Sequence, residues 1–185
     1  MKKDNDQLTD KQWLALLVLL IILSGFFRMF SASAAAEDAP SYTIPQAVLD
    51  ADPAFAAIME EAEKYIGSPY VYGGSNPEKG FDCSGFVCWV YREAGVYNGG
   101  RKGAKSLKQV CAYVAPGDAR PGDLIFFTGT MGPDVKGITH VGIYVGNDWM
   151  LHCGDPIGYA DLRDLKWAQK FHSFGRLIQE GGAAE

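Results

Sequence analysis

The stretch that decides the fold is GFDCSGFV, residues 80–87. Asp82 is a residue type that caps helices by accepting hydrogen bonds from free backbone N–H groups, and apolar residues follow it at helical spacing. The pattern predicts a helix that begins near Cys83, ends at Gly95 and buries Phe86, Val87, Val90 and Tyr91 or Ala94. Cys83 then lies at the helix amino terminus, where the helix dipole stabilises the thiolate and free N–H groups could face an oxyanion.

A cysteine at this place is not catalytic by position alone, because a free cysteine is commonly a small buried hydrophobe. A nucleophilic cysteine needs a histidine to take its proton and later to protonate the leaving group. The chain has three histidines: His140, His152 and His172. His172 follows basic and aromatic residues near the C-terminus, and we expect it on the surface.

His140 and His152 belong to two segments that alternate like strands. Val141, Ile143 and Val145 share one face of the first segment, so His140 faces the other side. In the second segment, the same alternation separates His152 from its apolar neighbours Leu151 and Cys153.

The loop between these strands decides whether the histidines meet. If residues 146–148 form a three-residue hairpin loop, Val145 pairs with Trp149, and His140 and His152 share a face as diagonal neighbours. A two-residue loop would place them on opposite faces. We therefore expect His152 to accept a hydrogen bond from His140 and to fix its tautomer, the alternative being two half-buried strand histidines.

The rest of the chain predicts an α+β domain with helices first and antiparallel strands afterwards. Asp52-Pro53 begins an amphipathic helix that ends at Gly67, with Phe55, Ile58, Met59, Ala62, Tyr65 and Ile66 on its apolar face. A turn-rich segment follows it. Further elements are a basic, glycine-rich loop at 98–105, a short helix at 106–114, strands at 124–127, 139–145, 149–153 and 174–178, and a loop at 129–137.

The first 36 residues have the pattern of a targeting segment. Lysines precede an uncharged apolar run at 13–27, and small residues follow at 31–36. A secretory signal peptide and an uncleaved membrane anchor both fit, and both put the rest of the chain outside the cytoplasm. We divide the chain into this segment (1–36), a polar, proline-broken linker (37–51) and a folded domain (52–180).

Composition limits the possible functions. The chain has 185 residues, of which 48% are hydrophobic and 21% charged, as expected of one folded domain with a short additional segment. Its formal net charge of −5 gives no indication of nucleic-acid binding.

Four motifs resemble the NlpC family of papain-like cell-wall peptidases in order and spacing. They are PYVYGG (69–74), GFDCSGFV (80–87), RPGDLIFF (120–127) and THVGIY (139–144). The resemblance implies a papain-like domain with N-terminal helices packed on a small antiparallel sheet. It also implies catalysis without metal or other cofactor on the stem peptides of peptidoglycan, at the bond between γ-D-glutamyl and a diamino acid.

The resemblance assigns roles residue by residue. It implies that Cys83 is the nucleophile, His140 the general base and acid, and His152 the polar residue that orients His140. Tyr70 matches a tyrosine that could help to hold the oxyanion, although a core aromatic would fit as well. Two further positions, Asp82 and Ser84, match residues that contact the amino end of the stem peptide in some members; helix capping explains both equally well.

Other functions stay open beside this one. Related folds use the same chemistry as wall amidases or acyltransferases, and an inactive domain could serve as a tethered component of an envelope or secretion machine. The remaining cysteines, Cys88, Cys111 and Cys153, form no cluster with the usual spacing of zinc ligands. Export would permit at most one disulfide among them if Cys83 stays free, and we expect Cys111 and Cys153 to be buried.

Overall fold

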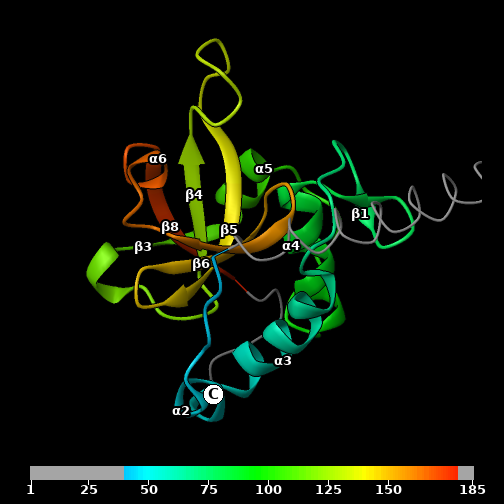
Figure 1. Ribbon diagram of the computed structural model, residues 1–185, viewed down its shortest axis with the longest axis vertical. Helices are drawn as coiled ribbons and strands as arrows, with labels where there is room; N and C mark the ends of the chain where they lie inside the picture. Colours follow the sequence, from blue (N-terminus) through cyan, green and yellow to red (C-terminus); the bar gives the residue numbers. More distant parts are fainter. Residues whose placement is uncertain (1–39, 179–185) are drawn as a thin grey trace, which may run out of the picture. The chain divides into compact units, whose positions relative to one another are not determined.

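A computed structural model describes residues 40–178 of the chain. The domain is α+β, as expected: a six-stranded antiparallel sheet in the order β3-β8-β4-β5-β6-β7 packs against helices (Figure 1). The strands of this sheet are β3 (Cys111–Val114), β4 (Leu124–Thr128), β5 (Ile138–Gly146), β6 (Trp149–Cys153), β7 (Ile157–Asp161) and β8 (Phe171–Leu177). The helices are α2 (Gln46–Ala51), α3 (Pro53–Ala62), α4 (Cys83–Glu93), α5 (Ala104–Gln109) and α6 (Leu165–Ala168), and two short strands, β1 (Ser75–Asn76) and β2 (Gly80–Phe81), pair with each other.

Helix α3 begins where the sequence predicts. The carboxylate of Asp52 accepts hydrogen bonds from the N–H groups of Ala54 and Phe55, both at 3.1 Å. Its predicted apolar face is buried through Ala62, but a 3-10 turn at Glu63–Tyr65 follows, and Ile66 is 46% exposed rather than buried. The tighter turn changes the angular spacing of the residues, so that the face predicted from α-helical periodicity ends early.

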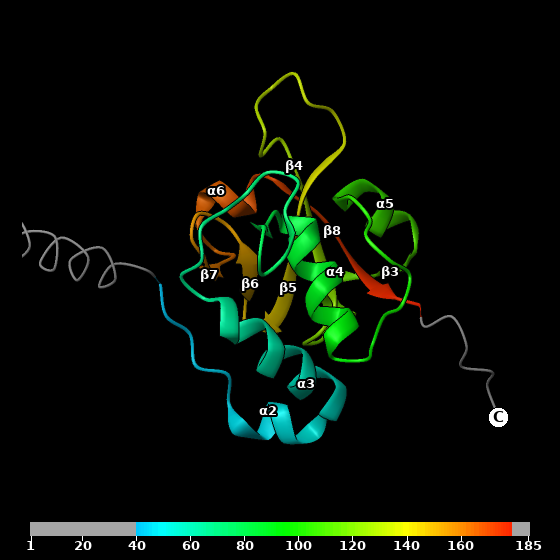
Figure 2. The same cartoon turned by 90° about the vertical axis from the view of Figure 1, so that its right-hand side faces the viewer.

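Helix α4 crosses the sheet over β5 and β6 (Figure 2). Asp82 caps it by accepting a hydrogen bond from the N–H of Gly85 at 2.7 Å, and Gly95 follows its end with a φ of +71°. The predicted core positions Phe86, Val87, Val90 and Tyr91 are all buried, whereas Ala94 is only half-buried. The sequence therefore predicts this helix and its buried face correctly.

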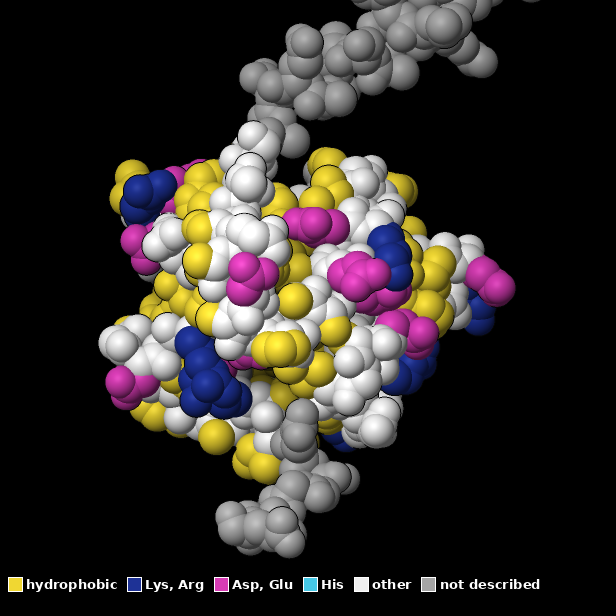
Figure 3. Space-filling model, turned by 90° about the horizontal axis from the view of Figure 1, so that it is seen from below, with side chains coloured by type: hydrophobic (Ala, Val, Ile, Leu, Met, Phe, Trp, Pro, Cys, Tyr) yellow, Lys and Arg dark blue, Asp and Glu magenta, His cyan; other side chains and the backbone are white. Residues whose placement is uncertain are grey.

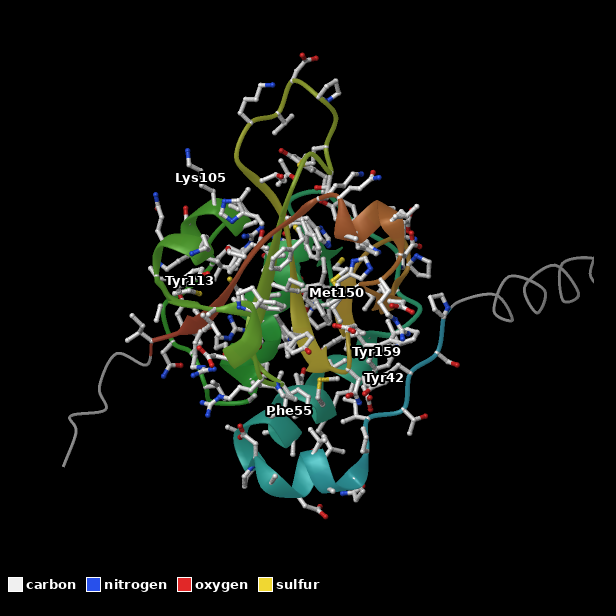
Figure 4. All side chains as sticks on the ribbon, turned by 90° about the vertical axis from the view of Figure 1, so that its left-hand side faces the viewer. Tyr42, Phe55, Lys105, Tyr113, Met150 and Tyr159 are labelled. Atoms are coloured by element: carbon white, nitrogen blue, oxygen red, sulfur yellow. The ribbon has the colours of Figure 1, made fainter. Side chains whose placement is uncertain are left out.

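Both faces of the sheet carry a hydrophobic cluster. On the helix side, Leu124 and Phe126 of β4 pack with Val141, Ile143 and Leu151. On the other side lie Ile125, Phe127, Met150, Ala160 and Phe174, and Figure 4 labels Met150 in this layer. The alternation of β5 and β6 places His140 and His152 on the second side, as their sequence pattern predicts.

One predicted helix differs from the structure, and several short elements were not expected. The helix expected at 106–114 is only α5, Ala104–Gln109, and Cys111–Val114 form β3, which pairs with β8. Pairing along the edge of the sheet outweighs the weak helical pattern of those four residues. Strand β7 and helix α6 were not predicted, and neither were the short strands β1 and β2.

The segment predicted as a linker also differs. It contains α2, and Ile44 is buried in the core. Tyr42 stacks on Trp149 with ring centroids 5.1 Å apart, and its hydroxyl accepts a hydrogen bond from Asn147 at 3.0 Å. Figure 4 labels Tyr42 beside Tyr159 of β7. Residues 40–51 therefore pack on the domain, because apolar and aromatic side chains among the polar ones find partners there.

Within residues 40–178, no helix is long and apolar enough to cross a membrane. The predicted signal peptide or anchor at 1–36 lies outside the described residues. On the face seen in Figure 3, acidic and basic side chains are interspersed.

Gly85 determines how closely α4 approaches the loop before β1. A Cβ at this position would overlap the backbone carbonyl oxygen of Gly74. We expect Gly85→Ala to lower the free energy of unfolding by about 1–3 kcal/mol, because a backbone atom cannot move aside as a side chain does. Urea unfolding measures this loss. Gly117→Ala is the control, since a Cβ there meets nothing within 4 Å, and equal losses in both variants would contradict the prediction.

Candidate active site

Cys83 is the first residue of α4, and its side chain is buried against β5. The backbone N–H groups of Val141 and Ser84 act on the sulfur and lower the pKa of the thiol, but burial and the negative charge of Asp82 outweigh them and raise it overall. The resting state is therefore the thiol, and a base must remove its proton when it reacts. Val141 directly follows His140, so the sulfur lies at the backbone of the strand that carries the predicted base.

His140 and His152 meet across β5 and β6. Nε2 of His140 and Nδ1 of His152 are 3.0 Å apart, and the rings are nearly perpendicular at 82°. The distance is that of a hydrogen bond, in which one nitrogen donates and the other accepts. The expected pairing of the two histidines is present in the structure.

The hairpin that brings them together differs from the predicted one. Gly146 pairs with Trp149, so that only Asn147 and Asp148 form the loop, both with positive φ (51° and 61°). The register shifts between Tyr144 and Gly146. This bulge adds one residue to β5 and reverses the parity that a two-residue loop would otherwise impose.

Both imidazoles are held neutral by burial. Burial lowers the pKa of His140 to about 4, although the negative charge of Asp82 opposes this. Burial lowers the pKa of His152 well below the usual value, and the neighbouring His140 and Lys166 add to the effect. A neutral imidazole keeps one unprotonated nitrogen, so His140 retains the capacity to accept a proton at neutral pH.

Trp167 of α6 covers the two histidines. Its ring stacks on His140 at a centroid distance of 5.4 Å and meets His152 edge-on at 4.8 Å, while Phe127 packs against both Trp167 and His140. The indole excludes water from the imidazole pair and thereby supports its neutral state. Sequence reasoning missed this residue because α6 has only four residues and no apolar periodicity to reveal it.

Tyr70 lies in the segment before β1, where it forms an isolated bridge with Phe81. Its backbone N–H donates to the carboxylate of Asp155 at 3.1 Å. Burial, followed by the charges of Cys83 and Asp82, raises the pKa of its hydroxyl to about 12. The hydroxyl therefore stays protonated and can donate a hydrogen bond near Cys83.

Asp82 and Ser84 hold the start of α4. Oδ1 of Asp82 accepts hydrogen bonds from the Ser84 hydroxyl at 2.9 Å and from the N–H of Gly85 at 2.7 Å. Oδ2 accepts from the guanidinium of Arg101 at 2.7 Å and from the N–H of Gly73 at 3.2 Å. Asp82 therefore caps α4, which is the alternative role predicted from the sequence for both residues. Ser84 supports the cap by donating a hydrogen bond to the carboxylate of Asp82.

All four cysteines are free thiols among the described residues. The thiol of Cys153 donates to the carbonyl of Phe81 at 3.2 Å, and burial raises its pKa to about 12. Cys88 and Cys153 are buried, whereas Cys111 is only half-buried, contrary to expectation, because it lies on edge strand β3. His172 is exposed, as expected. In residues 40–178, no cluster of three metal-ligating side chains forms.

Residues 67–176 match the sequence profile of the NlpC/P60 family. The chain belongs to the NlpC/P60 family. The matched range contains every site residue that the sequence predicts, from Tyr70 to His152.

Two curated relatives come from Bacillus subtilis. The bifunctional muramidase/DL-endopeptidase CwlT is 44% identical over 124 residues, which cover 66% of this chain and 36% of the relative. The gamma-DL-glutamyl hydrolase is 48% identical over 132 residues, which cover 69% of this chain and 31% of the relative. The chain thus spans well under half the length of either protein.

Solved structures of the NlpC/P60 family share the fold. A Staphylococcus aureus structure described as similar to a lipoprotein of the NLP/P60 family superimposes with a TM-score of 0.65 at 36% identity. The match covers 77% of this chain and 45% of that one.

The buried histidines make the NlpC/P60 domain sensitive to acid. Above pH ~6.5, a histidine is neutral in both the folded and the unfolded chain. As the pH falls from there toward 4, His140 and His152 bind protons in the unfolded chain but not in the folded chain. The free energy of unfolding therefore decreases. We expect the free energy of unfolding to fall by about 1 kcal/mol per pH unit for each histidine between pH ~6 and ~4.5.

Urea unfolding at a series of pH values measures this slope. His140→Gln should remove about half of it, one of the two protons. His172→Gln, which changes an exposed ring, is the control and should retain the full slope. An unfolding free energy that stays constant over this pH range would contradict the prediction.

Proposed function

We propose that the domain is a cysteine endopeptidase that hydrolyses peptide bonds in the stem peptides of bacterial peptidoglycan. Cys83 is the nucleophile, His140 the general base and acid, and His152 the residue that orients His140. The hydrogen bond between the two histidines, one residue from the backbone N–H that acts on the Cys83 sulfur, carries this proposal. The names of the two Bacillus subtilis relatives, a DL-endopeptidase and a gamma-DL-glutamyl hydrolase, support it.

The first half of the reaction forms a thioester. When the Nε2–H group of His140 donates a hydrogen bond to Nδ1 of His152, Nδ1 of His140 is unprotonated. This nitrogen accepts the thiol proton of Cys83 once the substrate is bound. The sulfur attacks the carbonyl carbon of the scissile amide. His140 then gives its new proton to the departing amine, and the C–N bond breaks.

The second half restores the enzyme. A water molecule gives a proton to Nδ1 of His140 and attacks the thioester carbonyl carbon. The C–S bond breaks and the proton returns to the sulfur, so that a carboxylic acid is released. Because burial keeps His140 neutral between these steps, the same nitrogen is ready to accept each proton.

Two groups of donors can stabilise the oxyanion of each tetrahedral intermediate. The first turn of α4 presents backbone N–H groups beside Cys83, and the helix dipole favours negative charge there. The hydroxyl of Tyr70, which stays protonated, is the second donor. We propose this oxyanion role for Tyr70.

The bond that we propose lies between γ-D-glutamyl and a diamino acid. One Bacillus subtilis relative is named a DL-endopeptidase and the other a gamma-DL-glutamyl hydrolase, and both names support this choice. We also propose that the domain acts outside the cytoplasm, secreted or tethered by residues 1–36, because that segment has the pattern of an export signal. If residues 1–36 are retained as an anchor, the proposed partners of the chain also include the membrane and envelope or secretion machinery.

Replacement of the nucleophile tests the enzyme assignment. Cys83→Ala should lower digestion of purified peptidoglycan by about 10³-fold or more, since no other group can form the thioester. Release of soluble fragments measures the rate, and mass spectrometry of the new termini identifies the bond. Cys111→Ala is the control, because that thiol lies on the edge strand β3.

The products separate the proposed activity from its alternatives. New D-glutamyl carboxyl and diamino-acid amino termini support the endopeptidase. A freed lactyl group on muramic acid would assign an amidase, and transfer to an added amine would assign an acyltransferase. Wall digestion unaffected by Cys83→Ala, or no digestion by the wild type, would overturn the assignment and favour an envelope component without catalysis.

His152 is expected to act through His140. His152→Ala removes the acceptor for the Nε2 proton and frees the ring to take the wrong tautomer, so we expect kcat to fall by about 10²-fold with little change in KM. His152→Asn keeps an acceptor oxygen and should retain more activity than the alanine variant. Equal activity of the two variants would show that hydrogen bonding at this position is not required.

A further inference from the structure

Arg101, from the glycine-rich basic loop, reaches the amino end of α4. Its Nη2 lies 2.7 Å from Oδ2 of Asp82, and its Nη1 lies 3.0 Å from the hydroxyl oxygen of Ser84. These two partners are the residues on either side of Cys83. The sequence pattern of the loop indicates only a solvated basic segment, so this contact is a finding of the structure.

The loop is held in place by α4 itself. The N–H of Lys102 donates to the sulfur of Cys88 at 3.4 Å, and the Cys88 thiol donates to the carbonyl of Lys102 at 3.6 Å. The guanidinium of Arg101 also donates to that carbonyl. Cys88 is buried. A buried thiol thus fixes the backbone next to Arg101, and the guanidinium is placed by the same helix that carries the nucleophile.

Capping alone does not need a charged residue at position 82. The hydrogen bonds from Ser84 and Gly85 require only an acceptor oxygen, which an asparagine would also supply. A carboxylate next to Cys83 has a cost, because its negative charge opposes a thiolate on the adjacent residue. The side chain of Asp82 is only 11% exposed, so water screens this repulsion poorly.

Tyr70 and Cys153, which interact electrostatically with Cys83, are neutral at pH 7, because burial raises the pKa of each to about 12. His140 of β5, which directly precedes Val141, is neutral as well, with a pKa of about 4. The charge that acts on the sulfur is that of Asp82, and this carboxylate is ion-paired with Arg101.

Building on the proposed role of Cys83 as nucleophile, we propose that Arg101 is a positioning residue that sets the reactivity of this thiol by neutralising Asp82. Its guanidinium compensates the carboxylate while the carboxylate continues to cap α4. Arg101 thereby contributes to the reactivity of Cys83 without touching the reacting atoms. Displacement of the loop from Asp82 would lower the fraction of thiolate and slow the attack.

The reactivity of Cys83 can be measured without substrate. We would follow alkylation of the full chain by iodoacetamide from pH 5 to 10 and quantify the Cys83 peptide by mass spectrometry, which separates it from the other three thiols. Arg101→Gln should raise the pKa of Cys83 by about one unit and slow its alkylation about 10-fold at pH 7. Asp82→Asn, which keeps the cap, should accelerate alkylation relative to the wild type.

The double variant Asp82→Asn, Arg101→Gln should return the alkylation profile close to that of the wild type, and Arg101→Lys should remain near it. Lys105→Gln is the matched control, because it removes an exposed positive charge on α5; its profile should be unchanged. An unchanged profile in Arg101→Gln, or one that the second substitution does not restore, would overturn the proposal. So would an unchanged profile in Asp82→Asn, which does not depend on the stability of the arginine variant.

Loss of the proposed function would have a different signature. If Cys83→Ala still digests the wall, Cys83 is not the nucleophile, yet the alkylation profiles would still report whether Arg101 controls its thiol. Conversely, unchanged alkylation in Arg101→Gln together with an inactive Cys83→Ala variant would remove the role of Arg101 and leave the nucleophile in place.

Discussion

The register between β5 and β6 is the constraint on which the site depends. His140 and His152 are twelve positions apart in the chain and form their hydrogen bond only when their side chains emerge on the same face of the sheet. The bulge near Val145 and the two-residue loop together determine that outcome. Loss of either feature alone would place the two imidazoles on opposite faces of the sheet, so the bulge and the loop are required together.

The neutrality of the site follows from how this hairpin is covered. Trp167 and Phe127 close over the imidazoles on one side of the sheet, and α4 covers the other side. Buried groups favour their uncharged forms, so that the thiol rests protonated and the imidazole rests unprotonated. In the proposed mechanism, the thiol and the imidazole therefore stay uncharged until a substrate arrives, and the helix terminus then stabilises the charge that develops.

Sequence reasoning succeeded where a local pattern and the fold agree. The start of α4, its buried face and the facing of His140 follow from residue types and spacing within a few positions. It failed where distant contacts decide the structure. Strand β3 forms because β8 offers an edge, the segment before α2 packs because Tyr42 stacks on Trp149, and Trp167 reaches the histidines from a helix of four residues. The bulge was not predicted, because a three-residue loop without a bulge also places His140 and His152 on the same face of the sheet.

The close approach of Gly85 to Gly74 links two walls of the site. The carbonyl of Gly74 accepts a hydrogen bond from the N–H of Asp82 at 3.0 Å, so the segment that carries Tyr70 is fastened to the helix that carries Cys83. A substitution that shifts the backbone of one wall therefore also shifts the other. The loop at 129–137 has no such tie to α4: its described hydrogen bonds join Thr130 to Thr139 at its own base and Lys136 to Pro133 within it. Diversification among relatives should accumulate there, in a segment that can lengthen or change its surface while the chemistry stays fixed.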